Sequence, residues 1–203
     1  MILNGGKTML FKNNEASWIF EPKTYTISDE KIVIKTEPRT DLWQRTYYGF
    51  QNNNAPALLV STKEKEFSFL VKTQFDSNHR FDQCGVIIYQ DSDNWFKASI
   101  EYQNEEYQRL GSVVTNYGYS DWATTDISAK YKQMYYRLSR RENDYCIENS
   151  YDGVNFKQMR IFHLFKASDE IRMGIYACSP EESSFNAVFT QIKFTECKWP
   201  IHK

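Results

Sequence analysis

FDQCGVIIYQDSDNWFKASIEYQ occupies residues 81–103 of this chain, and VVTNYGYSDW follows at 113–122. In the first stretch, every second residue from Cys84 to Ile88 is small or apolar, and polar or aromatic residues flank this run. Alternation of this kind predicts β-strands, because successive side chains of a strand point to opposite faces. The tetrapeptide DSDN at 91–94 consists of turn residues, so the sequence predicts a hairpin of two strands here.

The strand period of two also sorts the hairpin's side chains into two faces. The set predicted to face the core is Cys84, Val86, Ile88, Phe96, Ala98 and Ile100. The opposite face carries Gln83, Tyr89, Trp95, Lys97 and Glu101. Two interpretations of this second face stay open: a recognition surface, or a solvated sheet face with scattered charge.

Short alternating segments continue along the chain and are bounded by Asn, Asp, Gly, Ser or Pro. Including the two strands of the hairpin, the predicted strands are 31–36, 58–61, 67–73, 84–90, 95–101, 111–116, 134–140, 145–150, 156–160, 171–178 and 187–194. Many short strands at near-regular spacing predict an all-β sandwich or barrel. We expect one domain over residues 1–203.

Three connections carry more specific expectations. Asp152-Gly153 lies between two predicted strands and is the preferred pair for a type I′ hairpin turn. Residues 117–122 are expected to form a polar loop that carries Trp122 at its tip. A turn of helix is expected within 161–168.

Composition limits the classes of partner. The chain has 203 residues, of which 41% are hydrophobic and 16% aromatic, and its formal net charge is −1. This balance gives no electrostatic reason to expect nucleic acid or an anionic membrane as partner. No apolar run approaches the ~18–20 residues that span a bilayer. The first residues, MILNGGKTMLFKNNEASW, lack the features of a secretory signal.

The four cysteines lie at positions 84, 146, 178 and 197 and form no CxxC pair or zinc-type spacing. We therefore expect reduced thiols in a cytoplasmic protein, with no metal and no cofactor. The DSDN segment lacks the glycine and the distal glutamate of a calcium loop and is expected to be only a turn.

Neighbours of the hairpin's outer face are expected from elsewhere in the chain. Trp122 offers a ring face that either stacks on a sugar or packs under a neighbouring strand, and Trp43 is expected to line the same cleft. Arg137 needs a carboxylate partner, either Glu101 or Glu148, and forms either a structural salt bridge or a ligand contact. Glycoside hydrolysis would need two carboxylates at a suitable distance, and Glu101 with Glu148 or Asp121 are the pairs to consider.

Six blocks of sequence resemble one family: TDLW (40–43), FDQCGVIIYQDSDNWFKASIEY (81–102), VVTNYGYSDW (113–122), RLSRR (137–141), SYDGVNF (150–156) and RMGIYACSP (172–180). They are similar to the domain-of-unknown-function family named for a regulator of enolase, in the same order and from about residue 40 to 195. That family resembles the concanavalin A-like lectins and glucanases. The resemblance implies a jelly-roll sandwich of two antiparallel sheets with a concave groove, and it supplies no reaction.

The resemblance also implies a set of ligand-binding residues: Asp41, Trp43, Gln83, Trp95, Lys97, Glu101, Thr115, Ser120, Asp121, Trp122 and Arg137. The expected function is binding of a small carbohydrate or sugar-like metabolite, in which tryptophans stack on ring faces and polar groups bond to hydroxyls or an acidic group. Two alternatives remain: a protein-interaction module that regulates a metabolic enzyme, and a carbohydrate-active enzyme that uses Glu101.

Overall fold

The computed structural model describes residue 11 and residues 16–77, 79–167 and 169–201. The expectation about a secretory signal concerns a segment that lies largely outside these residues. Within the described part of the chain, no helix combines the length and apolar character that crossing a membrane requires.

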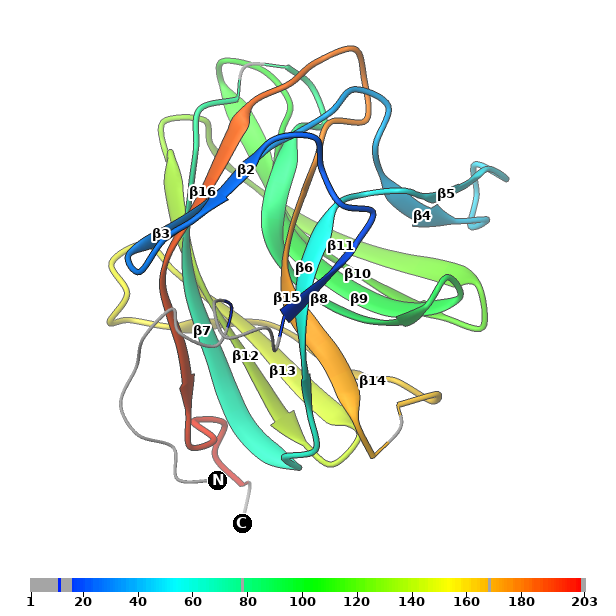
Figure 1. The fold of residues 1–203 in the computed structure, drawn as a ribbon, viewed down its shortest axis with the longest axis vertical. Coiled ribbons are helices and arrows are strands. Elements are labelled where there is room, and N and C mark those ends of the chain that lie inside the picture. The colour runs from blue at the N-terminus through cyan, green and yellow to red at the C-terminus, as the bar shows by residue number, and fades with distance from the viewer. Residues whose placement is uncertain (1–10, 12–15, 78, 168, 202–203) are drawn as a thin grey trace.

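Two seven-stranded antiparallel sheets stack to form a sandwich (Figure 1). Sheet A has the order β1 (Ala16–Ile19), β6 (Ala57–Thr62), β15 (Ile171–Cys178), β8 (Gln83–Asp91), β9 (Asn94–Tyr102), β10 (Tyr107–Asn116) and β11 (Tyr119–Ser128). Sheet B has the order β14 (Lys157–His163), β13 (Asp144–Ser150), β12 (Gln133–Arg141), β7 (Glu66–Phe75), β16 (Asn186–Thr195), β3 (Lys31–Lys35) and β2 (Tyr25–Ile27). The predicted all-β jelly-roll sandwich is confirmed.

The main core fills the space between the two sheets. The apolar face predicted for residues 84–100 lies entirely in this core, where it packs against side chains of sheet B such as Phe69 and Tyr136. β8 and β9 pair so that Gln83 lies opposite Glu101. The predicted assignment of side chains to the two faces is therefore confirmed, and the polar set faces outward from the sandwich.

A second apolar core lies on this outer face of sheet A. It is covered by a small hairpin of β4 (Leu42–Gln44) and β5 (Gln51–Asn53), which projects from the body of the sandwich (Figure 1). The members of the second core are Leu42, Trp43, Ala55, Ala57, Leu59, Ile87, Tyr89, Trp95, Val113, Tyr176 and Cys178. Part of sheet A is thus buried on both faces.

Several expectations about connections are wrong. Residues 119–128 form the long strand β11, and only Tyr117 and Gly118, both at positive φ, make the turn before it. Trp122 therefore lies on a strand and not at a loop tip. The sequence does not predict this strand, because β11 is an edge strand whose side chains are mostly exposed and polar and therefore lack an apolar alternation.

The two other turn expectations also need correction. At Asp152-Gly153 only the glycine has positive φ, so the turn is not type I′. The Asp152 carboxylate instead accepts the backbone N–H groups of Val154 and Asn155 and holds a wider loop. Residues 161–163 end β14, and no helix forms in the described part of 161–168. The 91–94 turn is confirmed, with Asp91 accepting the N–H of Asp93.

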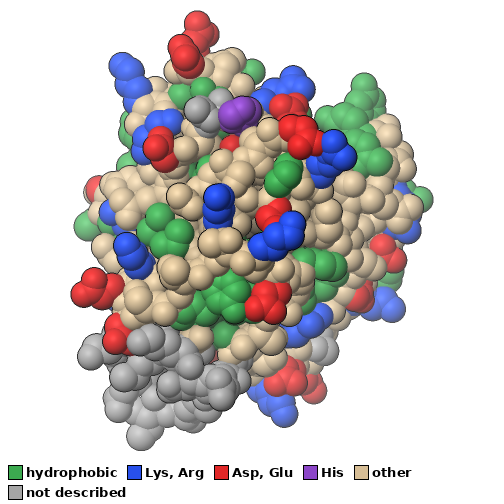
Figure 2. Space-filling view, turned by 45° about the horizontal axis from the view of Figure 1, so that its top comes forward, with side chains coloured by type: hydrophobic (Ala, Val, Ile, Leu, Met, Phe, Trp, Pro, Cys, Tyr) green, Lys and Arg blue, Asp and Glu red, His purple; other side chains and the backbone are tan. Residues whose placement is uncertain are grey.

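Charges of both signs are mixed over the surface. On the face shown in Figure 2, acidic and basic side chains are interspersed, and hydrophobic side chains form small separate patches. This distribution agrees with the net charge of −1. No single sign of charge dominates that face.

Candidate functional site

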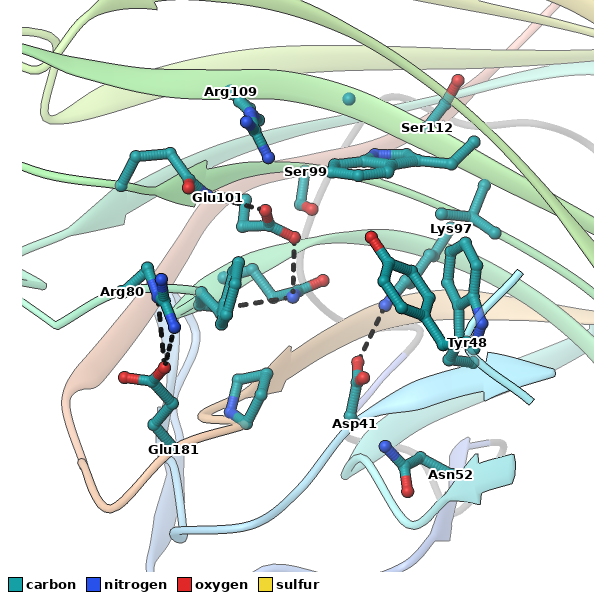
Figure 3. A pocket seen from close by; sticks show the side chains of 18 of the residues that line it. Asp41, Tyr48, Asn52, Arg80, Lys97, Ser99, Glu101, Arg109, Ser112 and Glu181 are labelled. Carbon is teal, nitrogen blue, oxygen red and sulfur yellow. Dashed lines mark hydrogen bonds and ion pairs between the residues drawn. The ribbon is translucent and has the colours of Figure 1, made fainter. Parts of the chain in front are cut away.

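A cavity of about 580 Å³ lies on the outer face of sheet A. Its floor comes from β8, β9, β10 and β11, one wall from the β4–β5 hairpin, and the opposite wall from residues 80–81 and 180–181 (Figure 3). This volume is within the range of small-molecule sites in proteins, about 300–1,000 Å³. The cavity brings together six of the residues predicted for the site: Asp41, Trp43, Gln83, Lys97, Glu101 and Trp122.

Lys97 rises from the floor and meets Asp41 from the hairpin side, with Nζ 3.1 Å from Oδ1 (Figure 3). Its side chain is only 6% exposed, and Nζ also lies over the rings of Trp95 and Tyr176. Burial disfavours the charged form of Lys97, but the Asp41 carboxylate and other nearby negative groups outweigh this effect and raise its pKa. The ammonium therefore stays charged, and Asp41 accepts one of its three N–H donors.

Glu101 points into the cavity from β9 (Figure 3). The amide of Gln103 donates to Oε1 at 2.8 Å, and that of Gln83 donates to Oε2 at 3.4 Å. Burial raises the pKa of Glu101 to about 7, and the negative charge of Asp41 adds to the effect, whereas Lys97 and Arg109 oppose it. Glu101 therefore exchanges a proton near neutral pH.

Gln83 is held in one orientation by three hydrogen bonds. Its Oε1 accepts the hydroxyl of Tyr176, and its Nε2 donates to the carbonyl of Phe81 as well as to Glu101. Both N–H donors of the Gln83 amide are used in these bonds, so its Oε1 keeps one acceptor site at the cavity lining. Such pre-arranged donors and acceptors give a binding site its orientation and specificity.

Two indole rings supply the apolar part of the lining. Trp122 on β11 and Trp43 on β4 meet edge to face, with ring centroids 6.4 Å apart. Gly111 makes room for the Trp122 ring, because a Cβ at this position would be 3.0 Å from Nε1. The guanidinium of Arg109 lies over the same ring at 5.3 Å, a cation–π arrangement.

The hairpin itself covers three of the predicted site residues. Trp95 is fully buried in the second core and donates its N–H to the carbonyl of Ser92. Thr115 and Ser120 are bonded to each other, and Ser120 also accepts the backbone N–H of Gln44 from the hairpin. These side chains lie on the predicted face, but contacts within the chain occupy them.

Two further predicted residues lie away from the cavity. Asp121 pairs with Val114, whose side chain faces the main core, and binds Arg160 of sheet B at 2.7 Å. Arg137 lies on sheet B and pairs with Glu148, at 2.6 Å. Of its two expected partners, Glu148 is the correct one. The structure therefore brings neither Glu148 nor Asp121 to Glu101 as a second catalytic carboxylate.

The sequence did not single out several residues of the lining. Tyr48, Phe50 and Asn52 come from the hairpin, and Arg80 and Glu181 form an ion pair at 2.9 Å on the opposite wall. Arg109 could have been found from register alone, since it lies directly across from Glu101. The hairpin residues offered no alternating pattern.

Arg45 fastens the hairpin to the sandwich. Its Nη1 donates to Asp93 in the β8–β9 turn, at 3.1 Å, and to the carbonyl of Gly118 in the β10–β11 turn, at 2.9 Å. Gly118 has φ +75, and a Cβ there would be 2.0 Å from Nη1 of Arg45. The glycine thus provides both the turn conformation and the space for the guanidinium.

We expect Gly118→Ala to lower the free energy of unfolding by more than the roughly 1–2 kcal/mol that left-handed backbone costs an alanine, because Arg45 must also move. Gly49→Ala is the matched control, since Gly49 has φ +76 but nothing within 4 Å of its Cβ position. Urea denaturation of both variants measures the difference. Equal losses of stability would show that the Arg45 contacts contribute nothing.

The architecture defines a class: a concanavalin A-like jelly-roll sandwich with a cavity on the outer face of one sheet. The solved structure of a GH43 protein, BlXynB from Bacillus licheniformis, shares this fold, with a TM-score of 0.69 and 14% identity over 90% of this chain and 37% of that one. At this identity the likeness concerns the fold alone. This chain matches only about a third of the larger protein.

The chain belongs to the family described as "Protein of unknown function (DUF1349)", whose model matches residues 18–197. It is 30% identical over 187 residues to a Saccharomyces cerevisiae protein named "Regulation of enolase protein 1", covering 91% of this chain and 92% of that protein. It is also similar to the crystal structure of a functionally unknown protein from Saccharomyces cerevisiae. There the TM-score is 0.83 and the identity 27%, over 93% of this chain and 98% of that one.

Proposed function

We propose that this protein binds a small carbohydrate or sugar-like metabolite in the cavity on sheet A. One observation carries the proposal: two indole rings and a set of fixed polar groups, Gln83, Lys97 and Glu101, line the same cavity. Sugars have apolar ring faces and polar edges, so a site that recognises them needs aromatic stacking beside directional hydrogen bonds. In this proposal Trp122 and Trp43 supply the stacking, and the polar groups bond to hydroxyls or to an acidic substituent.

We expect titration with a panel of monosaccharides and sugar acids to give heat, together with a rise in the melting temperature. Trp122→Ala should weaken binding about tenfold, because it removes both the apolar area that the sugar buries and an aromatic contact worth roughly 0.5–1.5 kcal/mol beyond that area. The matched control is Tyr119→Ala, an exposed aromatic residue on the same strand that does not line the cavity. A wild-type protein that binds neither a member of this panel nor a longer sugar would refute the proposal.

Regulation of a metabolic enzyme is a second candidate, favoured by the name of the yeast relative, "Regulation of enolase protein 1". Enolase turnover measured with and without the purified protein tests it. If an effect on turnover survives Trp122→Ala, the interface lies away from the cavity. We further infer that the protein works in the cytoplasm, with support from its four free thiols.

A catalytic role for Glu101 has less support. Its pKa of about 7 would suit an acid or base, but its hydrogen-bond partners are the neutral amides of Gln83 and Gln103. Lys97 and Asp41, which also line the cavity, already form an ion pair with each other. We therefore propose binding and not hydrolysis.

A further inference from the structure

A continuous series of aromatic rings leads from the interior of the cavity to solvent. Trp122 contacts Trp43 at 6.4 Å between ring centroids, and Trp43 contacts Tyr48 at 5.4 Å. Tyr48 then stacks on Phe50 at 5.4 Å, with ring planes 19° apart, and meets Tyr47 at 5.0 Å. Tyr47, Tyr48 and Phe50 belong to the connection between β4 and β5. The aromatic lining of the cavity therefore extends along the hairpin.

The three rings on the hairpin connection are far more exposed than Trp43. Trp43 is 9% exposed, whereas Phe50 is 46%, Tyr48 52% and Tyr47 93% exposed. A group of large apolar side chains in water marks an interaction site more often than a single exposed residue does. Because Tyr48 and Phe50 also line the cavity, this exposed surface and the cavity form one continuous site.

The backbone holds these rings in place. Gly49 donates its N–H to the carbonyl of Arg45 at 2.8 Å, and Tyr48 donates to that of Thr46 at 2.7 Å. Arg45 is itself bonded to two turns of sheet A. A ring that is already ordered loses little conformational entropy when a ligand stacks on it. The hairpin is thus suited to binding and not merely to covering the sheet.

The opposite side of the cavity is polar. Figure 3 shows Arg80 and Glu181 across the cavity from Tyr48, and their ion pair leaves further N–H donors and carboxylate lone pairs for a ligand. A chain that leaves the cavity would have aromatic faces on one side and charged hydrogen-bonding groups on the other. An oligosaccharide matches both sides, whereas an apolar protein segment would leave Arg80 and Glu181 without new partners.

We propose that the ligand is an oligosaccharide: one sugar ring occupies the cavity against Trp122, and the chain continues over Tyr48 and Phe50. This inference rests on the proposed carbohydrate binding. It adds a second subsite on the hairpin. This subsite would make the affinity depend on the number of sugar rings in the ligand.

Calorimetric titration with glucose, xylose and galactose, each followed by its β-1,4-linked di-, tri- and tetrasaccharide, tests the inference. For the series that binds, affinity should rise at least tenfold from the monosaccharide to the trisaccharide. Tyr48→Ala should weaken trisaccharide binding about tenfold and monosaccharide binding no more than two- to threefold. Tyr48→Leu keeps the apolar bulk without the ring and should behave in the same way.

Phe165→Ala is the matched control, because Phe165 is exposed and stacks on Tyr117 in a comparable pair outside the cavity. It should leave all affinities unchanged. Three results would overturn the inference while leaving the proposed function intact: monosaccharide binding that does not strengthen with chain length, an equal loss for both ligands in Tyr48→Ala, or a dimer in sedimentation that Tyr48→Ala dissociates. If no sugar of any length binds, the proposed function fails and the inference with it.

Discussion

Asp41→Ala is expected to lower the free energy of unfolding by about 3–5 kcal/mol, the cost of leaving one member of a buried ion pair without its partner. Lys97 is nearly fully buried, and Asp41 is the acid that bonds its Nζ, at 3.1 Å. Without Asp41 the buried ammonium must either remain charged without its hydrogen-bonded carboxylate or lose its proton. Urea denaturation at neutral pH measures the loss.

The double variant Asp41→Ala/Lys97→Met isolates the ion pair from the other contacts of Asp41, which also accepts the N–H of Leu42. An apolar side chain at position 97 removes the unpaired charge, so the double variant should be more stable than Asp41→Ala alone. Arg39→Ala breaks an exposed ion pair with Glu182 and should remain near wild-type stability. A loss below about 1 kcal/mol in Asp41→Ala would contradict a desolvated pair.

Glu101→Gln is expected to stabilise the protein at high pH. The pKa of Glu101 is about 7 in the folded protein, against an ordinary 4.5, so between these values the folded state binds more protons than the unfolded state. The free energy of unfolding of the wild type therefore falls as the pH rises through this window. Since Gln cannot ionise, the stability of the variant relative to wild type should increase by roughly 3 kcal/mol from about pH 4 to about pH 8.

Denaturation midpoints of both proteins, measured in steps across that range, give the difference at each pH. Other titrating groups, including Asp82, whose pKa burial also raises, occur in both proteins and cancel in the comparison. Glu106→Gln, at an exposed position, controls for the loss of one negative charge. Parallel stability profiles for wild type and Glu101→Gln would show that the Glu101 carboxyl is well hydrated in the folded state.

The register of β8 and β9 could be predicted from the sequence because it depends on alternation alone. A shift of one residue in the assignment of faces would have placed Val86 on the outer face of sheet A and Lys97 in the main core. The same argument correctly placed Gln83, Lys97 and Glu101 on one face. Wherever a strand has one apolar face, the sequence is sufficient to say which side chains gather together.

The β4–β5 hairpin could not be predicted in this way. Its strands have three residues each, too few to show a period of two. Consequently, nothing in the sequence pattern indicates that the chain itself covers Trp95 and Thr115. Arg137 was placed with the site by resemblance, and only the sheet topology shows that it lies on the other sheet.

The contacts of Arg45 also bear on the order of folding. They join residues 48 and 73 positions apart in the chain, whereas β8 to β11 are consecutive strands joined by short connections. Loop closure costs more entropy for distant contacts, so consecutive hairpins tend to form early. Both anchors of Arg45 are turns of that meander, and they exist only once it has formed. We therefore expect the wall of the cavity that carries Tyr48 to form late, after the β8–β11 meander.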